Sequence, residues 1–312
     1  MPTIHLHLSL GGANCVLSVN SIPWLDHIFA PCVIRENNKI KMWFNGGRGY
    51  GNKKTYNIYF ATSKDGLKFS NISLLPIVRL NKGFSALTPA ILRTANGKVL
   101  REHGKYRLWF SEISFAKHDR KYTLHEIVCQ DGLHCSKPSP TELTNVYAPS
   151  VIKDGSEYRM WYVDPSVKHW VIRSAISKDG KYWHIIERPT LVVSQQWERG
   201  RLIYPYVMKL ANGTYIMFYT SYFSKIGKTA IGIATSRNGI IFKKYKYNPI
   251  IKPNGIAKNL SGAYVSTGSV VALNKKGWYR IYYSARPIWN GKGKEHKYFA
   301  ICTTSIQFQD DR

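Results

Sequence analysis

Carboxyl groups stand beside short apolar runs at several points of this chain. Four of its 18 acidic residues lie just before or just after such runs: Asp26, Glu112, Asp164 and Glu198. A carboxyl group beside a bound molecule can donate or accept a proton. These four acids are therefore the candidate catalytic residues.

Cationic and aromatic side chains occupy the same kind of position. The arginine fork binds carboxylate and phosphate groups in two-pronged fashion, and aromatic rings offer flat stacking surfaces. The candidate binding residues are Trp24, His27, Arg48, Tyr147, Arg201, Tyr204, Arg286 and Trp289. A structural histidine is the alternative for His27.

Each of the four acids also has a structural alternative. Glu198 can pair with a neighbouring arginine, and Glu112 with a nearby cation. Asp26 can cap the turn before the first apolar run, and Asp164 can start an Asp-Pro turn.

The elements that would position these side chains form a repeated unit. Residues 147–162 read as two strands joined by an Asp-Gly turn, and residues 171–177 give a third strand. A proline marks the first strand of four copies, at Pro31, Pro89, Pro149 and Pro205, which stand 58, 60 and 56 residues apart. A fifth copy begins near Thr267. A period of about 60 with three or four strands per unit predicts an all-β, five-bladed β-propeller, with a β-sandwich as the alternative.

We expect one domain over residues 1–312, with blades at about 21–80, 81–140, 141–195, 196–255 and 256–312. The first strand of each unit should line a central channel, and the aromatic second strand should pack between blades. Little chain follows the third strand of the last unit. A segment at residues 4–10 or 15–19 should therefore add the outer strand of the last blade and close the ring.

Composition limits the partners and the compartment. The net charge of +27 favours anionic partners such as nucleic acid, acidic polysaccharide or phosphorylated sugar, unless it reflects a basic composition spread over the surface. Five scattered cysteines without a CxxC pair predict neither a disulfide scaffold nor a zinc site, and favour a cytoplasmic location. No apolar run reaches the roughly 18 residues of a membrane helix. We expect no transmembrane segment, no metal and no cofactor.

The repeated motifs resemble the five-bladed propellers of glycoside hydrolase families 43, 32, 68, 62 and 130. The similarity lies in the Pro-x-Val-Ile inner strand at Pro149, the Tyr-x-Met-Trp-Tyr second strand at Tyr158, and the third strand that leads through Asp179-Gly180 to Trp183. It covers nearly the whole chain. It implies a carbohydrate-active enzyme whose active site lies at one mouth of the channel.

The resemblance also implies roles for the four acids. Cleavage of a glycosidic bond needs one carboxylic acid that protonates the leaving oxygen and one carboxylate as base or nucleophile. Glu198 corresponds to the acid, Asp26 to the base or nucleophile, and Asp164 and Glu112 are further candidates. The chain departs from the family 43 pattern, which has aspartates at the positions of Ala30 and Ser150.

Three functions follow as expectations. The first is an enzyme that acts on a glycosidic bond of an anionic or phosphorylated sugar. The second is a glycosyltransferase or glycoside phosphorylase that uses a phosphorylated sugar. The third is a non-catalytic propeller that binds glycan or nucleic acid.

Overall fold

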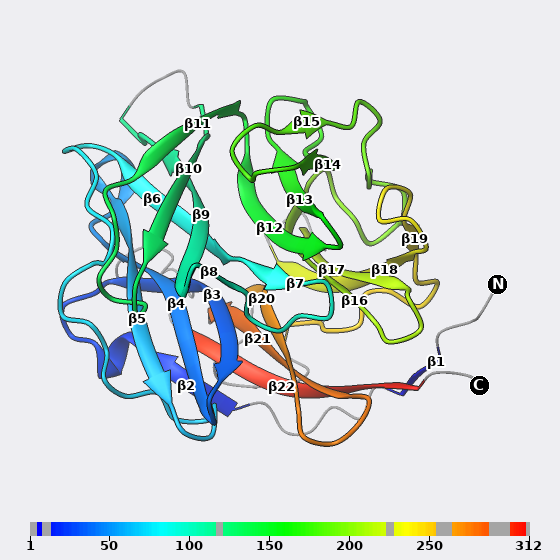
Figure 1. Cartoon of the computed structure of the whole chain (residues 1–312), viewed down its shortest axis with the longest axis horizontal. Helices are drawn as coiled ribbons and strands as arrows, with labels where there is room; N and C mark the ends of the chain where they lie inside the picture. Colours follow the sequence, from blue (N-terminus) through cyan, green and yellow to red (C-terminus); the bar gives the residue numbers. More distant parts are fainter. Residues whose placement is uncertain are drawn as a thin grey trace.

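The computed structural model describes residues 5–7, 14–116, 121–222, 228–253, 264–286 and 300–309. Five β-sheets stand around a common axis in these residues (Figure 1). The helical segments of the described residues are two short 3-10 turns, Val19–Ser21 and Gly51–Lys53. The predicted all-β, five-bladed propeller is confirmed. No described helix is long and apolar enough to cross a membrane.

Each blade contributes its first long strand to an inner ring. These strands are β3 (His27–Glu36), β6 (Ser85–Ile91), β12 (Tyr147–Asp154), β16 (Leu202–Lys209) and β20 (Tyr264–Ala272). Each contacts the next, and β20 contacts β3, so the ring is complete. The prediction that first strands are innermost is therefore confirmed.

The second and third strands follow outward in antiparallel order. The second strands are β4 (Lys39–Arg48), β9 (Lys105–Ile113), β13 (Glu157–Asp164), β17 (Tyr215–Tyr222) and β21 (Trp278–Arg286). The third strands are β5 (Thr55–Ser63), β10 (Thr123–Cys129), β14 (Val171–Ser177), β18 (Thr229–Ser236) and β22 (Ala300–Gln309). Short strands complete the sheets: β7 (Arg93–Thr94), β8 (Arg101–Glu102), β11 (Ser139–Thr144), β15 (His184–Ile185) and β19 (Lys243–Lys244).

The N-terminal segment closes the ring as predicted. Strands β1 (His5–His7) and β2 (Asn14–Ser18) both pair antiparallel with β22, so chain segments from opposite ends of the sequence share the last blade (Figure 1).

Four inner strands bend at the same point. The residue before the repeated proline has a positive φ in each: 49° at Ala30, 54° at Thr88, 51° at Ala148 and 53° at Tyr204. The pairing register with the second strand shifts across these residues. A positive φ is unfavourable for residues other than glycine, and bulges of this kind redirect the side chains around them. The repeated proline therefore marks a bend that separates the start of each inner strand from its straight remainder.

Buried tryptophans of the second strands link neighbouring blades. The indole N–H of each donates to a glycine carbonyl in the turn after the third strand of the next blade: Trp43 to Gly132 (3.0 Å), Trp109 to Gly180 (3.2 Å) and Trp161 to Gly239 (2.8 Å). Between the last and first blades, the Tyr282 hydroxyl donates to the Gly66 carbonyl (2.9 Å). The prediction that second strands pack between blades is confirmed. In the fourth blade Phe218 takes this position and has no donor.

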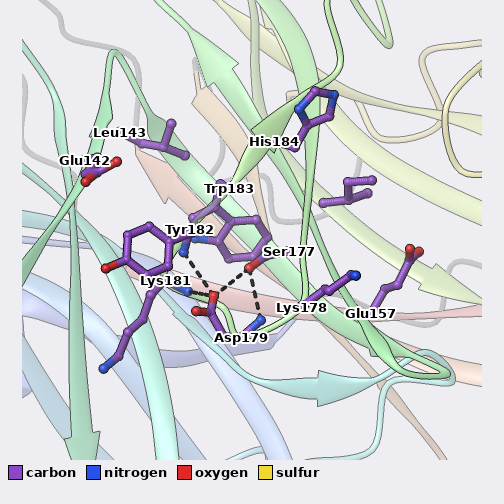
Figure 2. Close-up of a pocket in the computed structure, with 11 residues that line it drawn as sticks. Glu142, Leu143, Glu157, Ser177, Lys178, Asp179, Lys181, Tyr182, Trp183 and His184 are labelled. Carbon is purple, nitrogen blue, oxygen red and sulfur yellow. Dashed lines mark hydrogen bonds between the residues drawn. The ribbon is translucent and has the colours of Figure 1, made fainter.

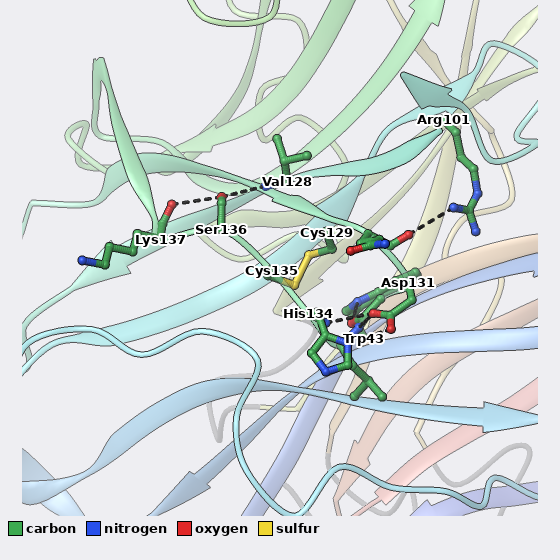
Figure 3. Close-up of a disulfide and its surroundings, with 12 residues drawn as sticks. Trp43, Arg101, Val128, Cys129, Asp131, His134, Cys135, Ser136 and Lys137 are labelled. Atoms are coloured by element: carbon green, nitrogen blue, oxygen red, sulfur yellow. Dashed lines mark hydrogen bonds and ion pairs between the residues drawn. A yellow bond between two sulfur atoms is a disulfide. The ribbon is translucent and has the colours of Figure 1, made fainter. Parts of the chain in front are cut away.

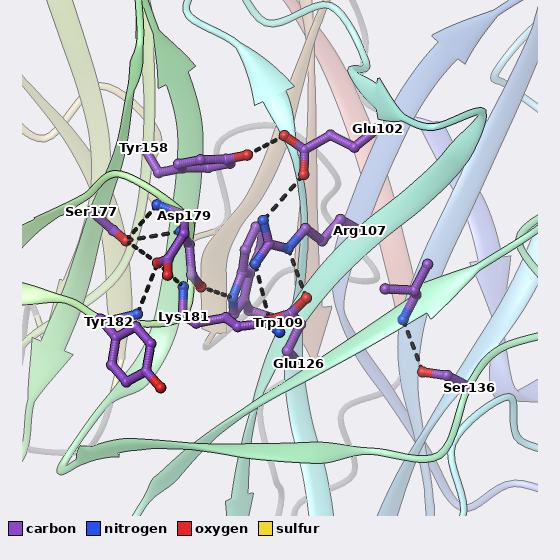
Figure 4. Close-up of polar contacts among 12 residues, drawn as sticks. Glu102, Arg107, Trp109, Glu126, Ser136, Tyr158, Ser177, Asp179, Lys181 and Tyr182 are labelled. Atoms are coloured by element: carbon purple, nitrogen blue, oxygen red, sulfur yellow. Dashed lines mark hydrogen bonds and ion pairs between the residues drawn. The ribbon is translucent and has the colours of Figure 1, made fainter.

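Acidic residues also link neighbouring blades, and two of them, Glu36 and Asp154, are the last residues of inner strands. The hydroxyls of Tyr106, Tyr158 and Tyr215 donate to Glu36, Glu102 and Asp154, each in the preceding blade. Arg107 bridges Glu102 and Glu126 in one of these clusters, at 3.1 and 2.7 Å (Figure 4). These three acids therefore form hydrogen bonds across the interfaces between adjacent blades.

Glu36 should make stability depend on pH in the acid range. Hydrogen bonds from Arg101, with others from Lys41 and Tyr106, lower the pKa of Glu36 to about 2 against the opposing effect of burial. A carboxylate with a lowered pKa stabilises the fold above its unfolded pKa of about 4.5, and this contribution is lost as the pH falls toward 2. We expect Glu36→Gln to remove part of the fall in unfolding free energy that the wild type shows over this range. Urea titrations at several pH values would measure it.

The control for this experiment is Glu142→Gln, because Glu142 is exposed. Its pH dependence should match that of the wild type. The same steep fall in the Glu36 variant would contradict the assignment.

The structure adds one disulfide to the expectation about the cysteines. Cys129 and Cys135 form a disulfide across the turn that contains Asp131 and Gly132 (Figure 3). The two residues pair as an isolated antiparallel bridge, which brings their side chains together. The expectation of no disulfide scaffold rested on the absence of CxxC, and it did not include a single disulfide between cysteines that flank a turn.

Candidate functional site

Aromatic residues gather where the inner strands begin. Phe29, Tyr147, Tyr204 and Tyr264 belong to one buried cluster with apolar residues from all five blades. The Tyr147 hydroxyl donates to that of Tyr204 at 2.7 Å. We call this end of the ring the mouth. Predicted residues Tyr147 and Tyr204 therefore meet there.

A second set of aromatic residues extends this cluster outward. Tyr122 lies 4.8 Å and Trp170 6.0 Å from Tyr147, measured between ring centroids. In the first blade Tyr56 lies 5.1 Å from Phe29 and 5.7 Å from Phe115. Sequence reasoning missed these residues because it considered only the starts of first strands and the ends of second strands. The sequence does contain a pattern that could have predicted them. In three blades an aromatic residue stands at the start of the third strand or directly before it: Tyr56, Tyr122 and Trp170.

Cations lie on several of these rings. Arg201 stacks 4.5 Å from the Trp170 ring and Arg286 stacks 4.7 Å from that of Tyr264. Lys54, which was not predicted, lies 4.4 Å from the Phe115 ring. A cation over an aromatic face is attracted by the ring and keeps donors for a ligand. Arg201 and Arg286 thus belong to the mouth.

Two other predicted binding residues make their described contacts within the first blade. The exposed Arg48 donates from Nε to the Trp24 carbonyl at 2.5 Å. Trp24 packs against the core of the first blade. Trp289 lies outside the described residues.

Asp26 and His27 connect with the aromatic cluster through the first blade. The half-buried Asp26 accepts the Gly49 N–H at 3.0 Å and lies 3.4 Å from the Tyr50 hydroxyl. The His27 ring contacts Tyr50 and Tyr56 at 5.2 and 5.7 Å, and Nε2 lies 3.0 Å from the Gly49 carbonyl. Tyr56 belongs to the aromatic cluster of the mouth, so Asp26 is connected to the mouth through Tyr50 and His27.

Asp164 is held as a carboxylate. It accepts Arg173 Nε at 2.7 Å and the Ser166 N–H at 3.0 Å. Burial alone would raise the pKa of Asp164, but the hydrogen bonds from Ser166 and Arg173 outweigh it and lower the pKa. The predicted Asp-Pro turn is present, since Ser166 closes it. An ionised carboxylate of this kind is suited to act as a base and not as a proton donor.

Glu112 faces a histidine. Its Oε2 lies 3.5 Å from His125 Nε2. Burial lowers the pKa of His125, which favours the neutral ring. One partner of Glu112 among the described residues is therefore an imidazole.

Glu198 lies inside the fourth blade. Its carboxylate accepts Lys244 Nζ at 2.5 Å and the Tyr219 hydroxyl at 2.7 Å. The backbone N–H groups of Ser194 and Gln195 add bonds of 2.8 and 3.0 Å, and the side chain has no exposed surface. The expected pairing with a neighbouring arginine is replaced by pairing with a lysine 46 residues away.

Each of the four acids has described partners of its own. Within the part of the chain that the structure describes, no hydrogen bond or ion pair joins any two of them. The same residues contain no group of three or more His, Cys, Asp or Glu side chains that could hold a metal.

A groove of about 500 Å³ lies away from the mouth, beside the turn after β14 (Figure 2). Trp183 and Tyr182 line it together with charged residues of both signs. The Trp183 ring packs 6.2 Å from Trp109, which connects this groove to the blade interface.

Sequence comparison finds two distant relatives of this chain. No family model matches the chain. Two uncharacterized proteins of Mycobacterium tuberculosis, from strains H37Rv and CDC 1551, are 25% identical over 192 residues, covering 57% of this chain and 60% of each relative. The match thus spans less than two thirds of these relatives.

Solved structures share the whole architecture. A glycoside hydrolase superposes with a TM-score of 0.71 at 15% identity, covering 89% of this chain and 87% of its own. The β-1,2-mannobiose phosphorylase of Listeria innocua gives 0.69 at 12% identity, covering 91% and 90%. The catalytic domain of the family 62 α-L-arabinofuranosidase of Coprinopsis cinerea gives 0.66 at 11% identity, covering 99% and 98%. The chain therefore has the five-bladed propeller fold of these glycoside hydrolases and phosphorylases.

Proposed function

We propose that this protein is a carbohydrate-active enzyme that acts on a glycosidic bond of an anionic sugar at the mouth. The observation that carries the proposal is the half-buried edge of the aromatic cluster, formed by Tyr122 and Trp170, with Arg201 stacked on Trp170 and Arg286 on Tyr264. Aromatic faces pack against the apolar faces of sugar rings, and arginine forks bind carboxylate or phosphate groups. The net charge of +27 would attract such a substrate over a longer range.

Asp26 is the leading catalytic group in this proposal. It is half-buried, and its neighbours His27 and Tyr50 link it to the mouth. Asp164 follows as a carboxylate kept ionised by Arg173. Glu112 stays a predicted candidate. Glu198 also stays one, but its fully buried carboxylate and its bond to Lys244 favour a structural role.

Asp26→Asn should lower turnover by about 10²-fold, because the amide can neither accept a proton nor act as a nucleophile. Purified protein would be assayed on oligosaccharides that contain uronic acid or sugar phosphate, beside neutral ones. The melting temperature should stay near that of the wild type, since asparagine can still accept the Gly49 N–H.

The matched control is Asp131→Asn, in an exposed turn where asparagine also accepts backbone N–H groups. It should keep full activity. Full activity of Asp26→Asn on a substrate that the wild type cleaves would remove Asp26 from the proposal. Turnover that requires phosphate or a nucleotide sugar would instead identify a phosphorylase or transferase.

A second candidate function is a non-catalytic glycan-binding propeller. The observation that favours it is that two of the four acids are held in ion pairs with little exposed surface, Asp164 with Arg173 and Glu198 with Lys244, whereas glycosidic cleavage needs carboxyl groups that reach the substrate. Binding of an anionic oligosaccharide without any turnover would support it. Binding of nucleic acid would appear as a steep loss of affinity with salt.

The compartment is also a matter of proposal. The cytoplasmic location inferred from the cysteines remains a prediction. The disulfide Cys129–Cys135 weighs against it, because disulfides persist mainly in oxidising compartments.

A further inference from the structure

We propose that Cys15 and Cys302 form a thiol–disulfide modification site that fastens the N-terminal strand to the last blade. The inference is independent of the proposed function, because neither residue belongs to the mouth. It assigns a second disulfide to a chain in which the structure shows Cys129–Cys135 bonded and these two cysteines free.

The strand register places the two cysteines opposite each other. Cys15 of β2 and Cys302 of β22 are direct Cα partners in the antiparallel pair that closes the ring. Side chains of directly opposed residues lie on the same face of the sheet, with Cβ atoms about 4.5–5.5 Å apart. A disulfide spans residues whose Cα atoms are about 4.4–6.8 Å apart, so little movement would be needed to join them.

The two thiols differ in the way that an attacking and a resolving cysteine differ. Cys15 is exposed, whereas Cys302 is buried. A hydrogen bond with the Cys302 thiol lowers the pKa of Cys15 to about 7, and the same bond with burial raises the pKa of Cys302. Cys15 is therefore the accessible thiolate at neutral pH, and the thiolate is the reactive form.

The oxidant would be a small-molecule disulfide such as oxidised glutathione. The Cys15 thiolate attacks one sulfur of the oxidant, which forms a mixed disulfide and releases one small thiolate. Cys302 then loses its proton to that thiolate and attacks the Cys15 sulfur, which releases a second small thiolate, and this takes up from water the proton that Cys15 gave up. Two protein thiols are oxidised to one disulfide, and one small disulfide is reduced to two thiols.

The remaining free cysteine provides an internal comparison. Cys32 is buried in the inner strand of the first blade, and burial raises its pKa to about 11. Its sulfur accepts the Ile91 N–H at 3.3 Å. Cys32 should stay a thiol under conditions that oxidise Cys15.

The experiment is a thiol count and a peptide map after equilibration with oxidised glutathione. Three thiols are free in the structure, and oxidation should reduce the number titrated after denaturation to one, Cys32. Mass spectrometry of the unreduced digest should show the peptides of Cys15 and Cys302 joined. In Cys15→Ser, two thiols should remain, Cys32 and Cys302.

Thermal unfolding supplies a second measurement. Oxidation should raise the melting temperature of the wild type by roughly 5 °C more than it raises that of Cys15→Ser. The Cys15→Ser variant keeps Cys129–Cys135, so it reports the contribution of that disulfide alone. Three titratable thiols after oxidation would overturn the proposal. So would a stable glutathione adduct on Cys15, or a disulfide between two copies of the chain.

Discussion

Replacement of Glu198 by glutamine should lower the free energy of unfolding by about 3–5 kcal/mol. The reason is Lys244, whose ammonium lies 2.5 Å from the Glu198 carboxylate with only 7% of its side chain exposed. Removing the negative charge leaves a buried ammonium without its counterion. Burial already lowers the pKa of Lys244 against the effect of Glu198, which shows how poorly the site solvates a lone cation. Chemical denaturation of the two proteins would measure the difference.

Two further variants separate the charge from the rest of the site. The double variant Glu198→Gln with Lys244→Met should recover much of the lost stability, because no unpaired charge stays buried. Glu157→Gln, in a half-buried pair 3.5 Å from Arg159, should cost less than about 1 kcal/mol, because the Glu157 side chain is 42% exposed. If Glu198→Gln instead left stability unchanged and removed activity, Glu198 would be the catalytic acid that its position in the sequence suggests.

Replacement of Trp161 by alanine should cost about 3–5 kcal/mol, the range for truncation of a large buried aromatic side chain. Trp161 is 1% exposed and fills the interface between the third and fourth blades, where it packs against Tyr215 and Phe242. Its indole N–H also donates to the Gly239 carbonyl at 2.8 Å. The substitution removes both the packing and the bond that recurs between blades.

Trp161→Phe isolates the hydrogen bond from most of the packing. We expect it to cost about 1–3 kcal/mol, because the Gly239 carbonyl loses its partner while an aromatic ring remains. The control Tyr182→Ala removes a ring that is 68% exposed and should change stability by less than about 0.5 kcal/mol. Equal losses in the phenylalanine and alanine variants would show that the bond, and not the packing, dominates this interface.

The architecture was predictable because its signals are local and repeated. Alternating apolar residues, an Asp-Gly or Asn-Gly turn and one proline recur in successive units, and each feature has a direct backbone cause. Asp65 illustrates this: its carboxylate accepts the N–H of Leu67 and of Lys68, as expected of a turn aspartate. Asp154 looked the same in sequence but pairs with Lys209 and Tyr215 of the next blade.

The site was less predictable because its partners are distant in the chain. Lys244 meets Glu198 only after β19 folds back beside β18, and no local pattern signals that pairing. Trp170 joins the mouth from the segment before a third strand, a position that the inner-strand argument did not cover. An aromatic and cationic mouth remains an expectation from the sequence, whereas the buried pairing of Glu198 with Lys244 was not expected.

Closure by β2 has a consequence for synthesis of the chain. Residues 14–18 are synthesised well before their partners at residues 300–303. At elongation rates of about 5–20 residues per second, β2 waits roughly 15–60 s for its partner strand. During this interval its apolar residues and backbone groups lack the neighbour strand that will cover them. The incomplete propeller is thus an open ring with an unpaired strand edge. At this stage, chaperone binding or pairing with another chain would compete with ring closure.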